Sequence, residues 1–134
     1  GAERAGKSVE EVEIVCRHQV IVTDDKEAAR NMIRAAFAPY YATPVYNAFL
    51  AWAGYEEVAS VIREGWAAKD REKTTSALDD QLVDDIAIIG TQEECQDRIR
   101  AYGEAGITTH IISCVSGTHA QATYNAFTCN QFTF

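Results

Sequence analysis

Two stretches of alternating and β-branched apolar residues stand out along the chain, at residues 12–23 (VEIVCRHQVIVT) and 107–115 (ITTHIISCV). Both faces of the first stretch carry apolar side chains, which is typical of a strand covered on both sides, as parallel strands are. Between and after these strands, apolar residues recur at helical spacing. The pattern therefore predicts the order strand, several helices, strand, helix, with the two strands joined by a right-handed parallel crossover.

The first two helices have recognisable start and stop signals. Asp24 followed by Glu27 predicts a capping box, and the alanine-rich stretch after it continues to Pro39, where we expect the helix to end. Thr43 and Pro44 then predict the N-cap and first residue of a second, very apolar helix.

The middle of the chain continues in the same way. Residues 55–69 predict a third helix, and residues 70–75 predict a charged break. Ser76 with Asp79 predicts the start of a further helix that extends as far as Ile89, although the run IAII near its end is also compatible with a short strand.

The clearest boundary between two secondary-structure elements lies at Gly90 and Thr91. Gly90 closes one element, and Thr91 with Glu94 predicts a capping box for the next helix. That helix is expected to end at Gly106, in the position of a C-terminal cap glycine. Residues 118–127 predict a final helix.

Composition and charge narrow the functional classes. The chain has 134 residues, 47% of them apolar, which suits one compact domain over residues 1–134. Its formal net charge of −8 argues against nucleic-acid binding, which needs a basic face. No apolar run approaches the roughly 20 residues that a membrane helix needs, so we expect no membrane partner. A cytoplasmic protein is the default expectation.

Three ordered features together resemble one family. They are residues 12–41, the stretch DDQLVDDIAIIGTQEECQDRIRAYGEAGIT, and the helical segment containing YNAFLAWAGYEE between them. The run Gly90-Thr91-Gln92-Glu93-Glu94 is similar to a G-T-x-E-E segment that begins the helix before the last barrel strand of luciferase-like monooxygenases. Over about residues 5–116 the chain resembles the C-terminal part of that family, most strongly the subgroup that uses a deazaflavin coenzyme.

The resemblance implies a fold and a chemistry. The fold would be α/β and helix-rich, a partial TIM-barrel-like (β/α) fragment with two parallel strands from the end of a (β/α)8 barrel. Whole barrels need about 250 residues, so we expect a fragment or truncated form that is inactive alone. The parent activity would be hydride transfer to, or oxygenation of, a small organic substrate by FMN or a deazaflavin coenzyme. The missing barrel half could come from another chain.

A second hypothesis is a non-catalytic module that has lost cofactor binding. A two-strand fragment leaves sheet edges and apolar helix faces uncovered, which predicts self-association as a homodimer. An enzyme would bind the cofactor with a defined stoichiometry. An interaction module would dimerise and leave the cofactor alone.

The candidate cofactor-binding residues each have a structural alternative. His18 lies inside an apolar strand, where a hydrogen-bonded core histidine is the competing interpretation. Tyr40 and Tyr41 belong to an aromatic cluster that could line a flat ring pocket or serve only in helix packing. Gly90 and Thr91 could offer backbone N–H groups to a phosphate, or could simply cap a helix. No catalytic residue is identified.

The cysteines allow one further alternative. Cys16 and His18 share a strand face, as do His110 and Cys114, so neighbouring strands would bring four potential zinc ligands together. The spacing lacks a CxxC pair, and buried free thiols are the preferred interpretation. We therefore predict no metal site.

Overall fold

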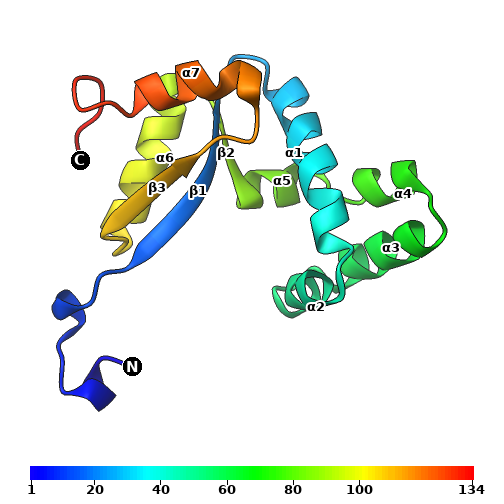
Figure 1. Cartoon of the computed structure of the whole chain (residues 1–134), viewed down its shortest axis with the longest axis horizontal. Coiled ribbons are helices and arrows are strands. Elements are labelled where there is room, and N and C mark those ends of the chain that lie inside the picture. Colours follow the sequence, from blue (N-terminus) through cyan, green and yellow to red (C-terminus); the bar gives the residue numbers. More distant parts are fainter. The chain divides into compact units, whose positions relative to one another are not determined.

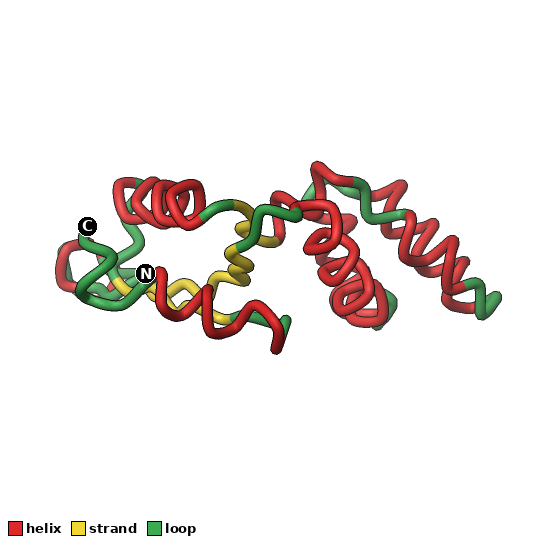
Figure 2. The backbone as a smooth tube through the Cα atoms, turned by 90° about the horizontal axis from the view of Figure 1, so that it is seen from above, coloured by secondary structure: helices red, strands yellow, loops and turns green.

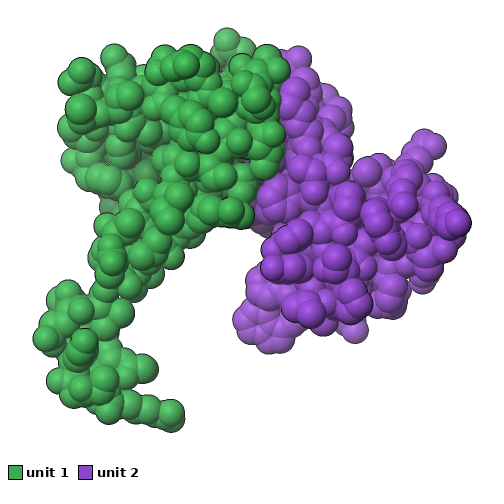
Figure 3. All heavy atoms as spheres, in the orientation of Figure 1, with its two compact units in different colours: residues 1–24, 88–134 green, residues 25–87 purple.

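The computed structural model describes all residues, 1–134. They form two compact units, which Figure 3 distinguishes by colour. Unit 1 consists of residues 1–24 and 88–134, and unit 2 consists of residues 25–87. Unit 1 is therefore built from two segments far apart in sequence, whereas unit 2 is continuous.

A three-stranded sheet is the centre of unit 1. The strands β1 (Val15–Val22), β2 (Ala87–Gly90) and β3 (Thr109–Ser113) are arranged in the order β2-β1-β3. β1 and β3 run parallel, with Cys16 opposite His110. Figures 1 and 2 show the strands side by side, with helix making up most of the remaining chain. The expected α/β class is confirmed, and β2 is a third strand in addition to the two predicted.

One apolar cluster joins the sheet of unit 1 to its helices. Val20 of β1 and Ile88 of β2 pack with Cys95 and Ile99 of α6 (Gln92–Glu104), and all four are at least nine-tenths buried. The last helix, α7 (Gly117–Ala126), is connected to β1 by the Val22 backbone N–H, which donates to Thr123 Oγ1 at 3.1 Å. The carboxyl end of the central strand is thus held by α6 and α7 together.

Both ends of α6 follow the prediction. The Thr91 side chain accepts from the Glu94 backbone N–H, and the Glu94 carboxylate accepts from the Thr91 backbone N–H, so the capping box is complete. Gly106 lies just after the helix with φ +104°, a left-handed conformation that favours glycine. Two short 3-10 helices, Glu3–Ala5 and Val9–Glu11, precede β1 and contain no buried residue.

Unit 2 is helical apart from Ala87, the first residue of β2. Its helices are α1 (Lys26–Tyr41), α2 (Pro44–Trp52), α3 (Glu56–Ala67), α4 (Arg71–Ser76) and α5 (Asp80–Ile86). Their inward faces carry fully buried side chains, including Ile33, Ile62 and Val83, and Leu78 between α4 and α5 is fully buried as well. As predicted, Thr43 is the N-cap residue of α2 and Pro44 is its first residue, where the missing N–H of proline costs nothing.

Two predictions about α1 are wrong. Its N-cap is Asp25, whose side chain accepts from the Ala28 backbone N–H at 3.0 Å, so Asp24 and Glu27 do not form the expected capping box. Pro39 does not end the helix, which continues to Tyr41. Proline removes only one hydrogen bond in this last turn, and the burial of Tyr41 to 8% exposure offsets that loss.

The segment expected as a charged break is helical. Asp70 caps α4 by accepting from the Lys73 backbone N–H, and Thr74 of α4 is buried. The next helix, α5, is capped by Asp79 instead of Ser76. It ends at Ile86, so the run up to Ile89 belongs to β2, the short strand that the sequence left open as an alternative.

No helix in the structure is both long and apolar enough to cross a membrane.

Candidate functional site

His18 is a core residue of unit 1. It lies in the middle of β1 with 5% of its surface exposed, and its Nε2 is 3.0 Å from His110 Nδ1. The Tyr102 ring of α6 packs against it with ring centroids 4.7 Å apart. Burial, followed by the neighbouring His110, lowers the pKa of His18 below its ordinary value. The ring is therefore neutral near pH 7, and one of its nitrogens is a donor and the other an acceptor.

The β1–β3 register explains why these side chains meet. Cys16 is the partner of His110 in the sheet, so Cys16, His18 and His110 share the face that α6 covers. Cys16 Sγ lies 3.9 Å from His18 Nδ1. Cys114 does not join them, because its thiol points to the Ser116 carbonyl. No group of three or more His, Cys, Asp and Glu side chains in the structure could hold a metal ion.

Tyr40 and Tyr41 differ sharply in accessibility. Tyr41 is 8% exposed, and burial raises the pKa of its phenol. Tyr40 is 42% exposed, and its ring lies against that of Tyr46, with centroids 3.7 Å apart. Phe49 and Trp52 of α2 are also exposed. Unit 2 thus presents aromatic rings to solvent, with Tyr40 among them and Tyr41 beneath.

Gly90 and Thr91 lie where β2 ends and α6 begins. The Thr91 backbone N–H already donates to the Glu94 carboxylate at 2.8 Å, and a Cβ atom at Gly90 would collide with that same carboxylate. The Thr23 backbone N–H donates to the Gly90 carbonyl at 2.8 Å, which places Gly90 beside the end of β1. An anion at this helix start would meet the Glu94 charge and compete for an occupied N–H group.

The sequence-predicted residues therefore do not converge within unit 1. His18 is five residues before Thr23 along β1, which is roughly 16 Å of extended strand from the Gly90 end. His18 faces α6, whereas Gly90 and Thr91 begin that helix. Tyr40 and Tyr41 belong to unit 2. Their role in cofactor binding remains a prediction.

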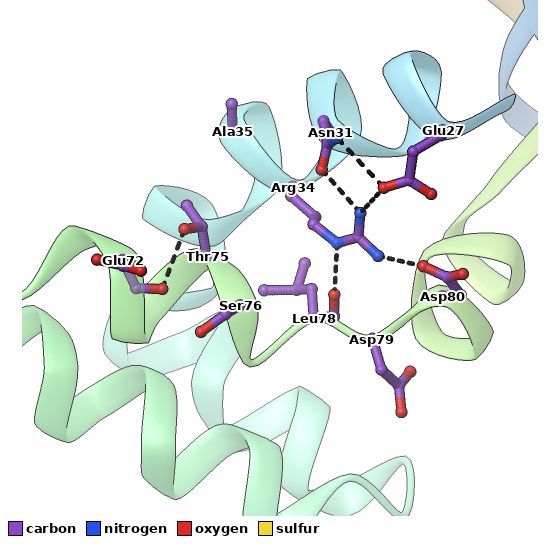
Figure 4. A pocket seen from close by; sticks show the side chains of 10 residues that line it. All are labelled: Glu27, Asn31, Arg34, Ala35, Glu72, Thr75, Ser76, Leu78, Asp79 and Asp80. Carbon is purple, nitrogen blue, oxygen red and sulfur yellow. Dashed lines mark hydrogen bonds and ion pairs between the residues drawn. The ribbon is translucent and has the colours of Figure 1, made fainter. Parts of the chain in front are cut away.

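Sequence reasoning missed a polar hollow in unit 2. This hollow of about 680 Å³ lies beside α1, α4 and the start of α5 (Figure 4). Arg34 dominates it: its guanidinium donates to the Leu78 carbonyl at 2.8 Å, to Asn31 Oδ1 at 2.8 Å and to Asp80. Long-range contacts of this kind leave no local pattern in the sequence. Because Arg34 is already bonded on three sides, the arrangement fastens α1 to α5 and leaves this guanidinium little capacity for a ligand.

Comparison with known proteins identifies the class. The sequence profile of the luciferase-like monooxygenases matches residues 1–109, and the chain belongs to this family. Its parallel sheet and surrounding helices agree with part of the family's barrel.

One curated relative is a Mycobacterium tuberculosis protein provisionally named a coenzyme F420-dependent oxidoreductase. It is 25% identical over 122 residues, which cover 84% of this chain and 34% of the relative. The chain thus spans about a third of the length of that protein.

Proposed function

We propose that this chain contributes to a flavin- or deazaflavin-dependent oxidoreductase that transfers hydride to, or oxygenates, a small organic substrate. The family match over residues 1–109 carries this proposal. The name of the mycobacterial relative favours the deazaflavin coenzyme F420 over FMN. When bound, such a group would supply the redox chemistry, and the protein would position it and exclude water.

The described residues fit the flat ring system of such a cofactor but not its phosphate. The exposed rings of Tyr40 and Tyr46 offer a surface on which a flat ring system can stack. The start of α6 does not fit a phosphate, because the Glu94 carboxylate occupies the Thr91 N–H. Since these residues do not complete a cofactor site, we derive no chemical step from them. We propose that the activity needs further barrel strands, from the same protein or from another chain.

A fluorescence titration with coenzyme F420 and with FMN tests the proposal. We expect saturable binding of coenzyme F420 to the partial site at Tyr40 and Tyr46, weakened about tenfold by Tyr40→Ala because a stacked ring is lost. Tyr124→Ala is the matched control, because Tyr124 is exposed to a similar extent but lies on α7. Absence of saturable binding of either cofactor would contradict cofactor binding by this chain.

A second candidate function is a non-catalytic module that associates with itself. Val45, Phe49 and Trp52 recur at helical spacing on α2 and are 75%, 53% and 80% exposed. We propose that this α2 stripe is covered in a two-fold dimer. Sedimentation at micromolar concentration should give a dimeric mass for the wild type and a monomeric mass for Phe49→Glu. Val9→Glu is the control at an exposed site outside α2. A monomeric wild type would overturn this candidate.

A further inference from the structure

A second hollow in unit 2, of about 290 Å³, lies beside α2 and α3. The residues that line it are Ala42, Pro44, Asn47, Ala48, Ala51 and Arg63. The alanine and proline side chains carry no polar group, so most of the wall is apolar. None of the lining residues is a candidate cofactor residue or part of the α2 stripe, so the hollow is a separate feature. Because a water molecule in the liquid occupies about 30 Å³, there is room for a ligand of about six non-hydrogen atoms.

A buried amide fixes the position of the charged group in this hollow. Asn47 is 5% exposed, and its Nδ2 donates to the Tyr41 carbonyl at 3.1 Å and to the Ala59 carbonyl at 2.7 Å. Because carbonyl oxygens only accept hydrogen bonds, these two contacts determine which way the amide faces. Asn47 Oδ1 accepts from Nη1 of the solvent-exposed Arg63 at 3.2 Å. The guanidinium is thus held in place before any ligand binds.

Arg63 has only neutral hydrogen-bond partners. Besides the amide, it donates to Ser60 Oγ at 3.2 Å, and it forms no ion pair. The carboxylate of its neighbour Glu64 accepts from Lys73 Nζ at 3.1 Å instead. The two arginines of α1, by contrast, are paired with aspartates. The Arg63 guanidinium uses two of its five N–H groups, so three N–H groups and an unpaired positive charge face an anion that enters the hollow.

The apolar wall and the unpaired charge together define the ligand. A carboxylate matches a guanidinium in charge and geometry, and the attraction is stronger beside a surface that excludes water. An alkyl chain on the carboxylate would cover Ala48 and Ala51, neither of which is buried. A second charged group on the ligand would lie against this apolar wall at a cost. We propose that the hollow binds a small aliphatic monocarboxylate, with its carboxylate on Arg63 and its chain on the alanines of α2.

Titration of the whole chain with butyrate at constant ionic strength, followed by ¹H–¹⁵N NMR, tests this site. The Arg63 Nε–H and the Ala48 and Ala51 amide resonances should shift saturably, with the millimolar dissociation constant expected for so small a ligand. Butyramide has the same number of non-hydrogen atoms but no charge, and should bind at least about tenfold more weakly. Acetate keeps the charge but lacks two methylene groups, and should also bind about tenfold more weakly. Equal binding of butyramide or of acetate, or no saturable shift with butyrate, would overturn the proposal.

Three variants locate the site, with binding monitored at the Ala51 amide. Arg63→Met keeps the length of the side chain but removes its charge, and should weaken butyrate binding about tenfold, to the level of butyramide. Arg98→Met is the matched control, because Arg98 is exposed on α6 of unit 1 and its loss should leave binding unchanged. Ala48→Leu fills the hollow without removing a hydrogen bond, since Ala48 is exposed on α2, and should also weaken binding.

The Ala48→Leu variant decides the matter if Arg63→Met, which takes a donor from the buried Asn47 Oδ1, proves unfolded by circular dichroism. Undiminished butyrate binding by either variant in its folded form would refute the assignment, as would equal weakening by Arg98→Met.

Discussion

The hydrogen bond between Thr123 and Val22 gives a sharp test of how unit 1 is held together. Thr123 is fully buried, and its Oγ1 accepts the Val22 backbone N–H at the end of β1. Thr123→Val replaces the hydroxyl by a methyl group of nearly the same volume. The substitution therefore leaves the packing of α7 intact and takes away the side-chain acceptor to which the Val22 N–H donates.

The expected cost follows from that unpaired donor. A buried N–H left without a partner destabilises a protein by about 1–3 kcal/mol. Thr123→Ser is the matched control, because it keeps the hydroxyl and loses one buried methyl, at about 1 kcal/mol. The two variants can thus lose similar free energies of unfolding for different reasons, and stability alone does not separate them.

Hydrogen exchange separates the two causes. The Val22 amide should exchange faster in Thr123→Val, beyond the change in global stability, and should keep its relative protection in Thr123→Ser. Urea unfolding followed by far-ultraviolet circular dichroism supplies the global value. Tryptophan fluorescence is a poor probe here, since Trp52 and Trp66 both belong to unit 2. Unchanged relative protection of Val22 in Thr123→Val would refute the role given to this bond.

Three other perturbations test separate features. Arg34→Met should destabilise unit 2 by about 1–3 kcal/mol in urea unfolding monitored by tryptophan fluorescence, and a loss below the error of that measurement would contradict the fastening of α1 to α5. Gly65→Ala should also destabilise unit 2, because the new Cβ would lie 2.7 Å from Thr74 Oγ1. This clash should outweigh the helix propensity of alanine, which favours the variant by about 1 kcal/mol. A stabilised variant would show that α4 moves aside easily. The pH dependence of unit 1 tests the burial of His18, whose folded-state pKa lies below its unfolded value of about 6.5. Between those two pKa values the unfolded chain binds more protons than the folded chain. Unit 1 should therefore lose stability as the pH falls through that window. His18→Gln should flatten this dependence, and an unchanged pH profile would assign it to other groups.

Local signals predicted the elements that depend on local contacts. The Thr91–Glu94 capping box and the left-handed Gly106 involve neighbours in the chain, and both are found as expected. The Asp24–Glu27 prediction fails by one position, because Asp25 beside it can cap equally well and the structure uses it. Two adjacent acidic residues carry no sequence information on which of them caps.

Tertiary contacts decided the remaining elements. Residues 71–76 are polar, yet they form α4 because Thr74 packs closely against Gly65 of α3. Strand alternation predicted that His18 and His110 would meet if their strands were neighbours, and they do. The bonds from Arg34 to Leu78 and Asp80 join residues distant in sequence, so no local pattern predicts them.

The discontinuity of unit 1 has a consequence for synthesis on the ribosome. β1 is synthesised before unit 2 and before its partner β3, in which Thr109 pairs with Val15, so the β1–β3 pairing cannot form until all of unit 2 has been made. The helices of unit 2 lie between them and depend on contacts within residues 25–87, so they can fold in the meantime. For that interval the edge of β1 that β3 later covers is open, and an open strand edge can pair with another chain and promote aggregation.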